Sequence, residues 1–346
     1  MKRIVIVGGG VAGKTLSEAL KENRNMEVIL VEPKEYIEAP FAQLRALVEP
    51  KTFSPLIRRK FSKLIPEVKQ IKQKAIAIKE KKLFLEDGSA LDFDFLVIAT
   101  GSKFPNWEYL KSSETNIKAR QKEVAYEAKK IKNADSVMII GGGTVGVELA
   151  GEIAYHWKDK KIILVNGGNR ILGGLNTKMT NRAVKVLSSM GVRIINNTIL
   201  TENEGKWIDD KGNLFEADLV YQTVGMSIDS EWINEDSGIT KTEKGYIKVD
   251  NTFRVIGRED IFALGDIADI PEIKLGAFAL KHAALMEKNI NSLIINPNAK
   301  LKTYKVGKPI GMVTIGKKRG AVQLPFGYPH FLISIKQKDL FASKVL

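Results

Sequence analysis

The chain has 346 residues, 44% hydrophobic and 27% charged, a composition typical of globular proteins and not of disordered or fibrous ones. Lys and Arg number 54 against 40 Asp and Glu, which gives a net charge of +14. The absence of cysteine excludes disulfide scaffolds, thiolate zinc sites and redox cysteine pairs. The three histidines, His156, His282 and His330, lie far apart, so we predict no metal site. A chain of this length holds more than one domain of ordinary size.

The N-terminus carries no pattern that would direct the chain across a membrane. Its apolar run, residues 4–7, is interrupted at once by Gly8 and is too short for a secretory signal peptide. Lys2 stands where the myristoylation pattern requires glycine. No run approaches the roughly 20 apolar residues of a membrane span. We therefore expect a cytoplasmic protein.

The excess of positive charge fits either a lysine-rich solvated surface or an anionic partner. The densest basic stretch, residues 69–82, alternates lysine with Ile and Ala and predicts a strand with charged flanks. Because it lacks the interleaved aromatic residues of a base-stacking platform, we do not expect nucleic-acid binding as the main function. Peripheral contact with an anionic membrane is the alternative, and such contact would weaken with salt.

The first predicted unit is a strand, a glycine-rich turn and a helix. Residues 4–7 are apolar, residues 8–13 read GGGVAG, and another apolar run occupies 28–31. In a GxGxxG turn the first glycine permits the bend and the second lets a pyrophosphate approach the backbone, while the third lets helix and strand pack closely. Glu32 ends the second strand, where a carboxylate can accept hydrogen bonds from ribose hydroxyls. This unit predicts a dinucleotide site.

The same unit recurs downstream. Residues 137–140 are apolar, residues 141–146 read GGGTVG, and 162–165 form the next apolar run. This second strand ends in Asn166 instead of an acid, so no carboxylate repels a 2′-phosphate there, and Arg170 follows in the same loop. The second site is therefore expected to take NADH, NADPH or both, with Arg170 as a solvated loop charge in the alternative interpretation.

Two further strands end in residues that suit a flavin. Residues 95–98 run into Thr100 and Gly101, and residues 261–264 run into a glycine and Asp266. An aspartate at such a position can accept hydrogen bonds from ribityl hydroxyls, while glycine leaves room for the cofactor. Their order around the second glycine-rich turn favours a flavoprotein.

In this order the motifs resemble those of the pyridine nucleotide-disulfide oxidoreductase superfamily. Within it, the chain is most similar to the apoptosis-inducing-factor homologues of the ferroptosis-suppressor type, which in turn look like type II NADH dehydrogenases. The resemblance covers nearly the whole chain. It rests on 8–13 with Glu32, on 44–45, 99–101, 141–146 with Glu148, 223–225, 265–266, 271–274, 281–283, 303–305, 323–326 and 338–341.

The resemblance implies an α/β fold with two Rossmann-like dinucleotide-binding domains, for FAD and NAD(P), and a small C-terminal α+β domain. The FAD-binding domain would consist of two pieces, residues 1–108 and 233–296. The NAD(P)-binding domain, 109–232, would be inserted between them, and residues 297–346 would form the C-terminal domain.

The resemblance also assigns candidate residues. FAD would be held by Gly8, Gly9, Gly10, Val11, Ala12, Gly13, Glu32, Arg45, Ala75, Thr100, Gly101 and Asp266. The nicotinamide nucleotide would be held by Gly141, Gly143, Thr144, Gly146, Asn166, Arg170 and Gly225. Glu148 is expected near the nicotinamide, Lys281 and His282 at a helix start facing the flavin, and Lys336 toward the acceptor. For His282 and Lys336 the alternative is packing and surface charge.

The lack of cysteine also bears on the reaction, because the disulfide reductases of this superfamily pass electrons through a cysteine pair. Here electrons must leave the flavin directly. We therefore predict an FAD-dependent NAD(P)H oxidoreductase with a quinone-like acceptor. The alternatives are a reductase of a small redox protein, such as a ferredoxin or rubredoxin, and a redox-sensing or DNA-binding flavoprotein.

The aromatic segment 326–333 is expected to be a packed core strand, with a quinone- or membrane-contact surface as the alternative. The chain stops soon after this segment, so we expect no long amphipathic C-terminal helix.

Overall fold

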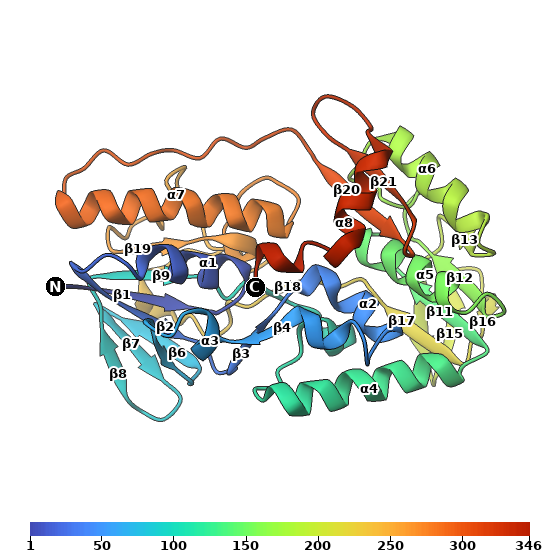
Figure 1. Ribbon diagram of the computed structural model, residues 1–346, viewed down its shortest axis with the longest axis horizontal. Coiled ribbons are helices and arrows are strands. Elements are labelled where there is room, and N and C mark those ends of the chain that lie inside the picture. Colours follow the sequence, from blue (N-terminus) through green and yellow to red (C-terminus); the bar gives the residue numbers. More distant parts are fainter.

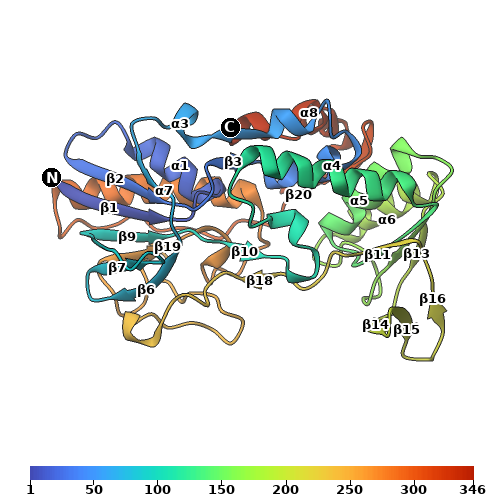
Figure 2. The same ribbon diagram turned by 90° about the horizontal axis from the view of Figure 1, so that it is seen from below.

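The computed structural model describes residues 1–346 and contains two parallel sheets that follow one another along the long axis (Figures 1 and 2). The N-terminus lies at the outer end of the first sheet, and the C-terminus returns to the middle of the molecule. None of the helices combines the length and the hydropathy that a membrane span requires. The predicted α/β fold with two Rossmann-like sheets is confirmed.

The first sheet contains the N-terminal strand and has the order β19-β9-β1-β2-β5, all parallel. Its strands are β1 (Lys2–Val7), β2 (Met26–Val31), β5 (Lys69–Ile71), β9 (Phe95–Ile98) and β19 (Ile261–Ala263). Residues 4–7 of β1 and 28–31 of β2 are continuous apolar runs because a parallel sheet is covered on both faces. Helices α1 (Val11–Leu20) and α7 (Gly276–Ile295) pack together on one face, with α7 drawn in orange in Figure 1.

A small antiparallel sheet covers the opposite face of the first sheet. It consists of β6 (Ala75–Lys79), β7 (Lys82–Leu85) and β8 (Ala90–Asp92). Val5 packs with Ile78 on this side, whereas Ile4 packs with Leu16 on the helix side. The basic stretch 69–82 contains the expected strand with charged flanks, which is β6, and it also contains β5, the edge strand of the first sheet. A turn between β5 and β6 carries the chain from one layer to the next.

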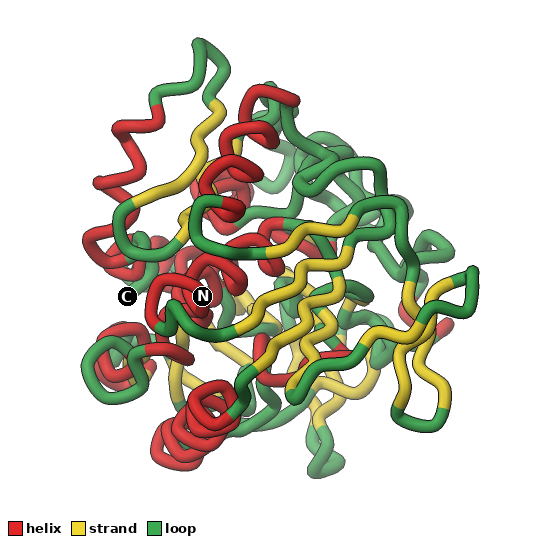
Figure 3. Tube along the Cα trace, turned by 90° about the vertical axis from the view of Figure 1, so that its right-hand side faces the viewer, coloured by secondary structure: helices red, strands yellow, loops and turns green.

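The second sheet repeats the parallel pattern in the order β13-β12-β11-β17. Its strands are β11 (Ser136–Ile140), β12 (Lys161–Val165), β13 (Arg193–Ile195) and β17 (Leu219–Gln222). Its helices are α4 (Ile117–Asn133), α5 (Thr144–His156) and α6 (Thr177–Ser188). The side chains of Asn116 and Asn176 cap α4 and α6 by accepting backbone N–H bonds. Figure 3 looks at this end of the molecule, with strands in yellow and helices in red.

Short elements join these parts. The two sheets are linked by an antiparallel ribbon of β10 (Ser102–Lys103) and β18 (Ser227–Ile228), where the chain enters and leaves the second sheet. The remaining elements are β3 (Tyr36–Glu38), α2 (Gln43–Val48), β4 (Arg58–Lys60), α3 (Phe61–Leu64), β14 (Leu200–Asn203), β15 (Lys206–Asp209) and β16 (Leu214–Phe215). Short 3-10 helices cover Pro40–Ala42, Ser54–Ile57, Pro105–Lys111, Glu235–Ser237, Gly265–Ile267, His330–Leu332 and Ala342–Lys344.

The C-terminal region is a hairpin followed by a helix: β20 (Gly311–Ile315), β21 (Arg319–Gln323) and α8 (Ile333–Asp339). It lies over α5 and α6, in red at the upper right of Figure 1. Gly151 of α5 permits this approach, because a Cβ there would lie 2.7 Å from the Ile315 Cα. An extended segment from α7 leads to the hairpin.

The expected core strand at 326–333 is wrong. The segment forms a turn and a 3-10 helix, His330–Leu332, that leads into α8. Phe326 and Phe331 are 81% and 76% exposed. Proline and glycine alternate before the helix, at positions 325, 327 and 329, and proline cannot donate the N–H bonds of a sheet interior. These two aromatic side chains therefore face outward, and the alternative, a quinone- or membrane-contact surface, stays a prediction.

Candidate functional site

The first glycine-rich turn joins β1 to α1. Gly8 has φ +100°, a region that favours glycine, and a Cβ added to Gly13 would run into the Gly8 carbonyl oxygen. A Cβ at Gly10, by contrast, would meet no atom within 4 Å. Gly10 is also the N-cap of α1, and no side chain caps the first amides of that helix. The turn thus leaves open space before uncapped helix amides, an arrangement that fits a phosphate group.

Glu32 folds back onto this turn. Its Oε2 accepts the Gly9 N–H at 2.7 Å, and its Oε1 accepts the Lys34 N–H at 3.0 Å. The carboxylate therefore lies beside the turn, at the end of β2. This is the position expected of a residue that accepts hydrogen bonds from ribose hydroxyls. Val11 and Ala12 begin α1 and are buried.

The second turn, between β11 and α5, reproduces the first. Gly141 has φ +121°, and a Cβ on Gly146 would run into the Gly141 carbonyl oxygen. Gly143 is the N-cap of α5, no side chain caps it, and a Cβ there would again meet no atom within 4 Å. Thr144 is the first residue of α5. Both predicted turns therefore combine tight packing behind with free space in front. Gly225, with φ +83°, lies beyond the end of β17, the strand next to β11.

Asp266 lies where β19 ends, beside β9. Its Oδ2 accepts hydrogen bonds from the Ser102 hydroxyl at 2.8 Å and from the Lys111 ammonium at 3.1 Å. Burial alone would raise the pKa of this carboxyl, but the Lys111 charge and the Ser102 bond outweigh burial and lower it. Asp266 is therefore an ionised acceptor at neutral pH, which fits the hydroxyls of a ribityl chain.

The neighbouring candidates lie near the same edge of the first sheet. The Thr100 hydroxyl donates to the Asp229 carbonyl at 2.7 Å, and Gly101 has φ +75°. Both residues follow β9, the neighbour of β1 and β19. Ala75 is buried at the start of β6.

Two candidates from distant parts of the chain form a buried ion pair. The Lys336 ammonium on α8 lies 2.7 Å from Glu148 Oε1 on α5. Glu148 Oε1 also accepts the Thr314 N–H at 2.9 Å and the Thr314 hydroxyl at 3.0 Å, and Lys336 donates to the Met312 carbonyl at 2.6 Å. Only 9% of the Lys336 side chain and 11% of the Glu148 side chain are exposed. The pair fixes the C-terminal region onto the helix that begins at the second glycine-rich turn.

Arg45 on α2 is committed to protein contacts. Its Nη2 lies 2.7 Å from Glu152 Oε1 on α5 and donates to Gln337 Oε1 on α8 at 2.6 Å. Arg45 is 3% exposed. The guanidinium therefore joins α2, α5 and α8, and its role toward FAD stays a prediction.

Lys281 and His282 do not lie at a helix start. The helix α7 begins at Gly276, so both residues lie in its second turn. Lys281 is exposed, with its ammonium 5.3 Å from the Phe278 ring centroid. His282 is buried and contacts the Gly265 backbone. The sequence misplaced the start because the N-cap is Leu275, which makes no side-chain cap bond.

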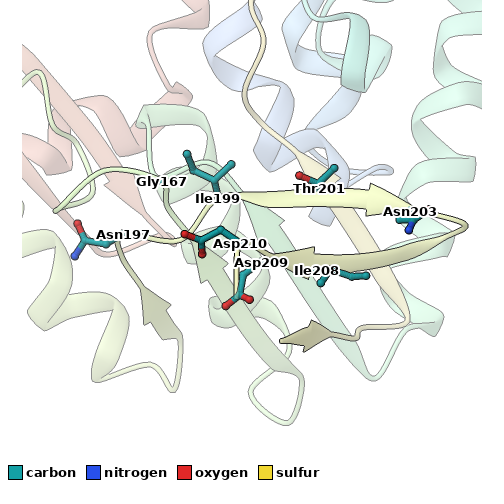
Figure 4. Close-up of a pocket in the computed structure, with 8 residues that line it drawn as sticks. All are labelled: Gly167, Asn197, Ile199, Thr201, Asn203, Ile208, Asp209 and Asp210. Carbon is teal, nitrogen blue, oxygen red and sulfur yellow. The ribbon is translucent and has the colours of Figure 1, made fainter. Parts of the chain in front are cut away.

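The end of β12 opens onto a polar cavity. Asn166 Nδ2 donates to the Gly168 carbonyl at 2.9 Å. Arg170 donates to the Thr177 hydroxyl at 2.8 Å and to the Gly173 carbonyl, so its guanidinium is engaged within its own loop. The cavity has a volume of about 480 Å³. Gly167, Ile199, Asp209 and Asp210 are among the residues that line it (Figure 4). None of the candidate catalytic residues lines it.

Three site residues escaped the sequence analysis: Ser102, Lys111 and Thr314. Ser102 directly follows Thr100 and Gly101, so the same motif could have predicted it. Lys111 ends a 3-10 helix and is one of many lysines, so no local signal marks it. Thr314 is a strand residue whose partner, Glu148, is 166 positions away, and only the tertiary fold brings them together.

Two glycine-rich turns, each at the carboxyl end of a strand in a parallel sheet, are the arrangement of a fold with two Rossmann-like domains. The chain belongs to the pyridine nucleotide-disulphide oxidoreductase family, which it matches over residues 2–287. This family uses a flavin and a nicotinamide nucleotide. The match includes both turns, Asp266 and Glu148.

Individual relatives extend the similarity into the C-terminal region. Apoptosis-inducing factor homolog A of Dictyostelium discoideum is 34% identical over 355 residues, 93% of this chain and 85% of that protein. Ferroptosis suppressor protein 1 of Xenopus tropicalis is 29% identical over 363 residues, 99% of this chain and 94% of that protein. The structure of NDH2 from Plasmodium falciparum in complex with NADH superposes with a TM-score of 0.78 at 14% identity, over 100% of this chain and 95% of that chain. The resemblance predicted from the motifs is confirmed.

Proposed function

We propose that the protein is an FAD-dependent NAD(P)H oxidoreductase that passes electrons to a quinone-like acceptor without a redox disulfide. The observation that carries this proposal is the pair of open glycine-rich turns, at Gly10 and Gly143, in a chain with no cysteine. FAD, when bound, would supply the two-electron carrier between nicotinamide and acceptor. We also propose the domain division 1–108 with 233–296, 109–232 and 297–346.

The chain's own residues have two tasks in this proposal. The first turn, with Glu32 and Asp266, binds FAD through its phosphates and hydroxyls, and the second turn binds the nicotinamide nucleotide. Glu148 then holds the Lys336 ammonium at the contact between α5 and α8. From there Lys336 places a positive charge toward the acceptor, where charge develops during reduction. Glu148 and Lys336 thus act as one unit.

We further propose NADH as the preferred nucleotide. Arg170 already donates to Thr177 and Gly173, so a 2′-phosphate would have to compete for its guanidinium. The cavity beside Gly167 carries Asp209 and Asp210, whose negative charge would oppose a 2′-phosphate. Asn166 contributes no charge of its own, so the expected preference is moderate.

The acceptor side is proposed to be the C-terminal region. Residues 297–346 carry ten Lys and Arg against a single acid, Asp339, a net +9 of the chain's +14. The exposed apolar residues Phe326, Phe331 and Ile335 lie in the same region. Basic charge beside exposed aromatic side chains suits peripheral contact of a cytoplasmic protein with an anionic membrane surface. Flotation with anionic vesicles at low salt, absent with neutral vesicles or with Phe326→Ser/Phe331→Ser, tests this part.

Anaerobic mixing of the flavin-loaded protein with NADH, and separately with NADPH, tests the main proposal. We expect prompt bleaching of the flavin's visible absorbance, faster with NADH, and recovery when a soluble quinone is added. A protein that takes up no FAD, or a flavin that neither nucleotide bleaches, would contradict the proposal.

A second candidate, the reductase of a small acidic redox protein, is favoured by the net charge of +14. Steered association with such a partner weakens steeply with ionic strength. Turnover that needs ferredoxin or rubredoxin, and that collapses between low and moderate salt, would support this candidate. Turnover with quinone alone and little salt dependence would support the first.

A further inference from the structure

Three sequence motifs that the proposed reaction does not use meet around one histidine. They are residues 271–274, which precede α7, residues 281–283, in its second turn, and residues 303–305, in the extended segment after it. Each contributes one polar side chain to the cluster: Glu272, His282 and Tyr304. The cluster lies directly behind the turn that carries Asp266, because His282 contacts the Gly265 backbone.

The hydrogen bonds define the protonation of His282. Its Nδ1 accepts the Gly265 N–H at 3.2 Å and therefore carries no proton. Its Nε2 lies 2.7 Å from Glu272 Oε1 and donates to it. The Tyr304 hydroxyl donates to Glu272 Oε2 at 2.8 Å. Only the neutral imidazole with its proton on Nε2 satisfies both contacts.

The surroundings favour this neutral form. The His282 ring is 2% exposed and packs 4.5 Å from the Phe253 ring and edge-on, at 4.7 Å, to Tyr304. The charged groups that face it are Glu272 and Lys274, before α7, and Asp266, in the adjacent turn. Burial lowers the pKa of His282, and Lys274 lowers it further, against the opposing pull of Glu272.

We propose that Glu272, His282 and Tyr304 are positioning residues for the flavin. They hold the Gly265 amide so that Asp266 keeps the orientation in which its carboxylate accepts hydrogen bonds from ribityl hydroxyls. The inference rests on the proposed FAD site at Asp266. Gly265 has φ +79°, so the turn depends on a backbone conformation available chiefly to glycine, and a side-chain acceptor fixes its N–H.

Tyr304 connects this support to the segment that leads to the C-terminal hairpin. Its backbone N–H donates to the Asn251 carbonyl at 2.6 Å, and the Asn289 side chain of α7 bonds the backbone of Lys302. These bonds anchor the extended segment beside α7, at the point where the Tyr304 hydroxyl donates to Glu272. Loss of that hydroxyl leaves the His282–Glu272 pair in place, so its effect on the flavin should be the smaller one.

The test titrates apoprotein with FAD and measures affinity by quenching of flavin fluorescence. His282→Leu should weaken FAD binding about tenfold, because the Gly265 N–H loses its only side-chain acceptor. His282→Asn should retain most of the affinity, since Asn Oδ1 takes the place of Nδ1. Tyr304→Phe should weaken binding about twofold to threefold. Wild-type affinity should fall only in acid, at a pH below the ordinary histidine range, because burial lowers the pKa of His282 and a proton on Nδ1 removes the acceptor. His282→Asn should lose that pH-dependent component.

A matched control is His330→Leu, because His330 Nδ1 accepts the Val322 N–H at 3.1 Å in the C-terminal region, far from Asp266. It should leave FAD affinity unchanged. In the wild type, ¹⁵N imidazole spectra should show His282 neutral with the proton on Nε2, a readout that does not depend on any variant folding. Equal FAD affinity in His282→Leu, His282→Asn and wild type, or a proton on Nδ1, would overturn the inference. Wild-type protein that binds no FAD at any pH would overturn the proposed function instead.

Discussion

The two glycine-rich turns have the same backbone conformation but different surroundings. In both, the first glycine has a positive φ, the last packs against the first, and the middle one faces open space. The helices that follow diverge: α1 packs through apolar side chains on α7, whereas α5 carries two buried carboxylates, Glu148 and Glu152. The corresponding positions in α1 are Thr15 and Ala19. The repeated motif thus builds the same open turn twice, and the residues in the next two turns of each helix determine which part of the protein packs against that helix.

The buried charges of α5 should give the largest effect. Lys336→Met removes the cation that Glu148 faces, and breaking a buried pair costs about 3–5 kcal/mol. The two Thr314 hydrogen bonds remain, so we expect the lower end, measured by urea unfolding. Lys2→Met serves as control, because the Lys2–Asp94 pair is 55% and 34% exposed and should contribute less than about 1 kcal/mol. Equal stabilities of Lys336→Met and Lys2→Met would show that the buried pair contributes nothing special.

The open middle glycines allow a reciprocal experiment. Gly10 and Gly143 have φ of −69° and −73°, which any residue adopts, and valine at either position meets no protein atom within reach of its Cβ. Gly143→Val should weaken nicotinamide nucleotide binding roughly a hundredfold and leave FAD content unchanged. Gly10→Val should do the reverse. Calorimetric titration and flavin absorbance measure the two outcomes, and a variant that loses both ligands would argue for misfolding.

The sequence predicts features whose residues are close together in the chain better than features formed by residues far apart in it. The turns at Gly8 and Gly141 were predictable because strand, turn and helix are contiguous and each glycine answers a local steric demand. The Glu148–Lys336 pair was not predictable as a pair, since its partners lie 188 positions apart and meet only when the C-terminal region packs on α5. Arg45 was assigned to FAD by resemblance alone, and its contacts with Glu152 depend on the placement of α2 against α5.

The errors of secondary structure have local causes. The strand expected at 326–333 was inferred from apolar residues, which were taken as a sign of burial. Pro325, Gly327 and Pro329, which disfavour a strand, were given too little weight. The start of α7 was placed too late because Gly276 weakens the helix signal and Leu275 offers no capping side chain. Periodicity predicts elements well where both ends carry a capping or turn residue.

Asp266 marks another difference between the two halves, because the second sheet has no strand equivalent to β19. Asp266→Ala should weaken FAD binding about 10- to 100-fold, since it deletes a charged acceptor of hydroxyl groups. Nicotinamide nucleotide binding should be unchanged. The measurement is FAD retained after gel filtration, with Asp269→Ala as control for a carboxylate nearby in the sequence. Full retention in Asp266→Ala would remove Asp266 from the flavin site.

The ends of β2 and β12 give the smallest expected effect. Glu32 bonds the Gly9 amide of its turn, whereas Asn166 bonds the Gly168 carbonyl of its own loop. Asn166→Asp makes the second site resemble the first and places a carboxylate where a 2′-phosphate would lie. We expect the ratio of NADH to NADPH turnover to rise about threefold to tenfold, chiefly by a higher KM for NADPH. Asn196→Asp, at the neighbouring amide that accepts from Asn166 Nδ2, is the matched control and should change the ratio less. An unchanged ratio in Asn166→Asp would show that the end of β12 does not select the nucleotide.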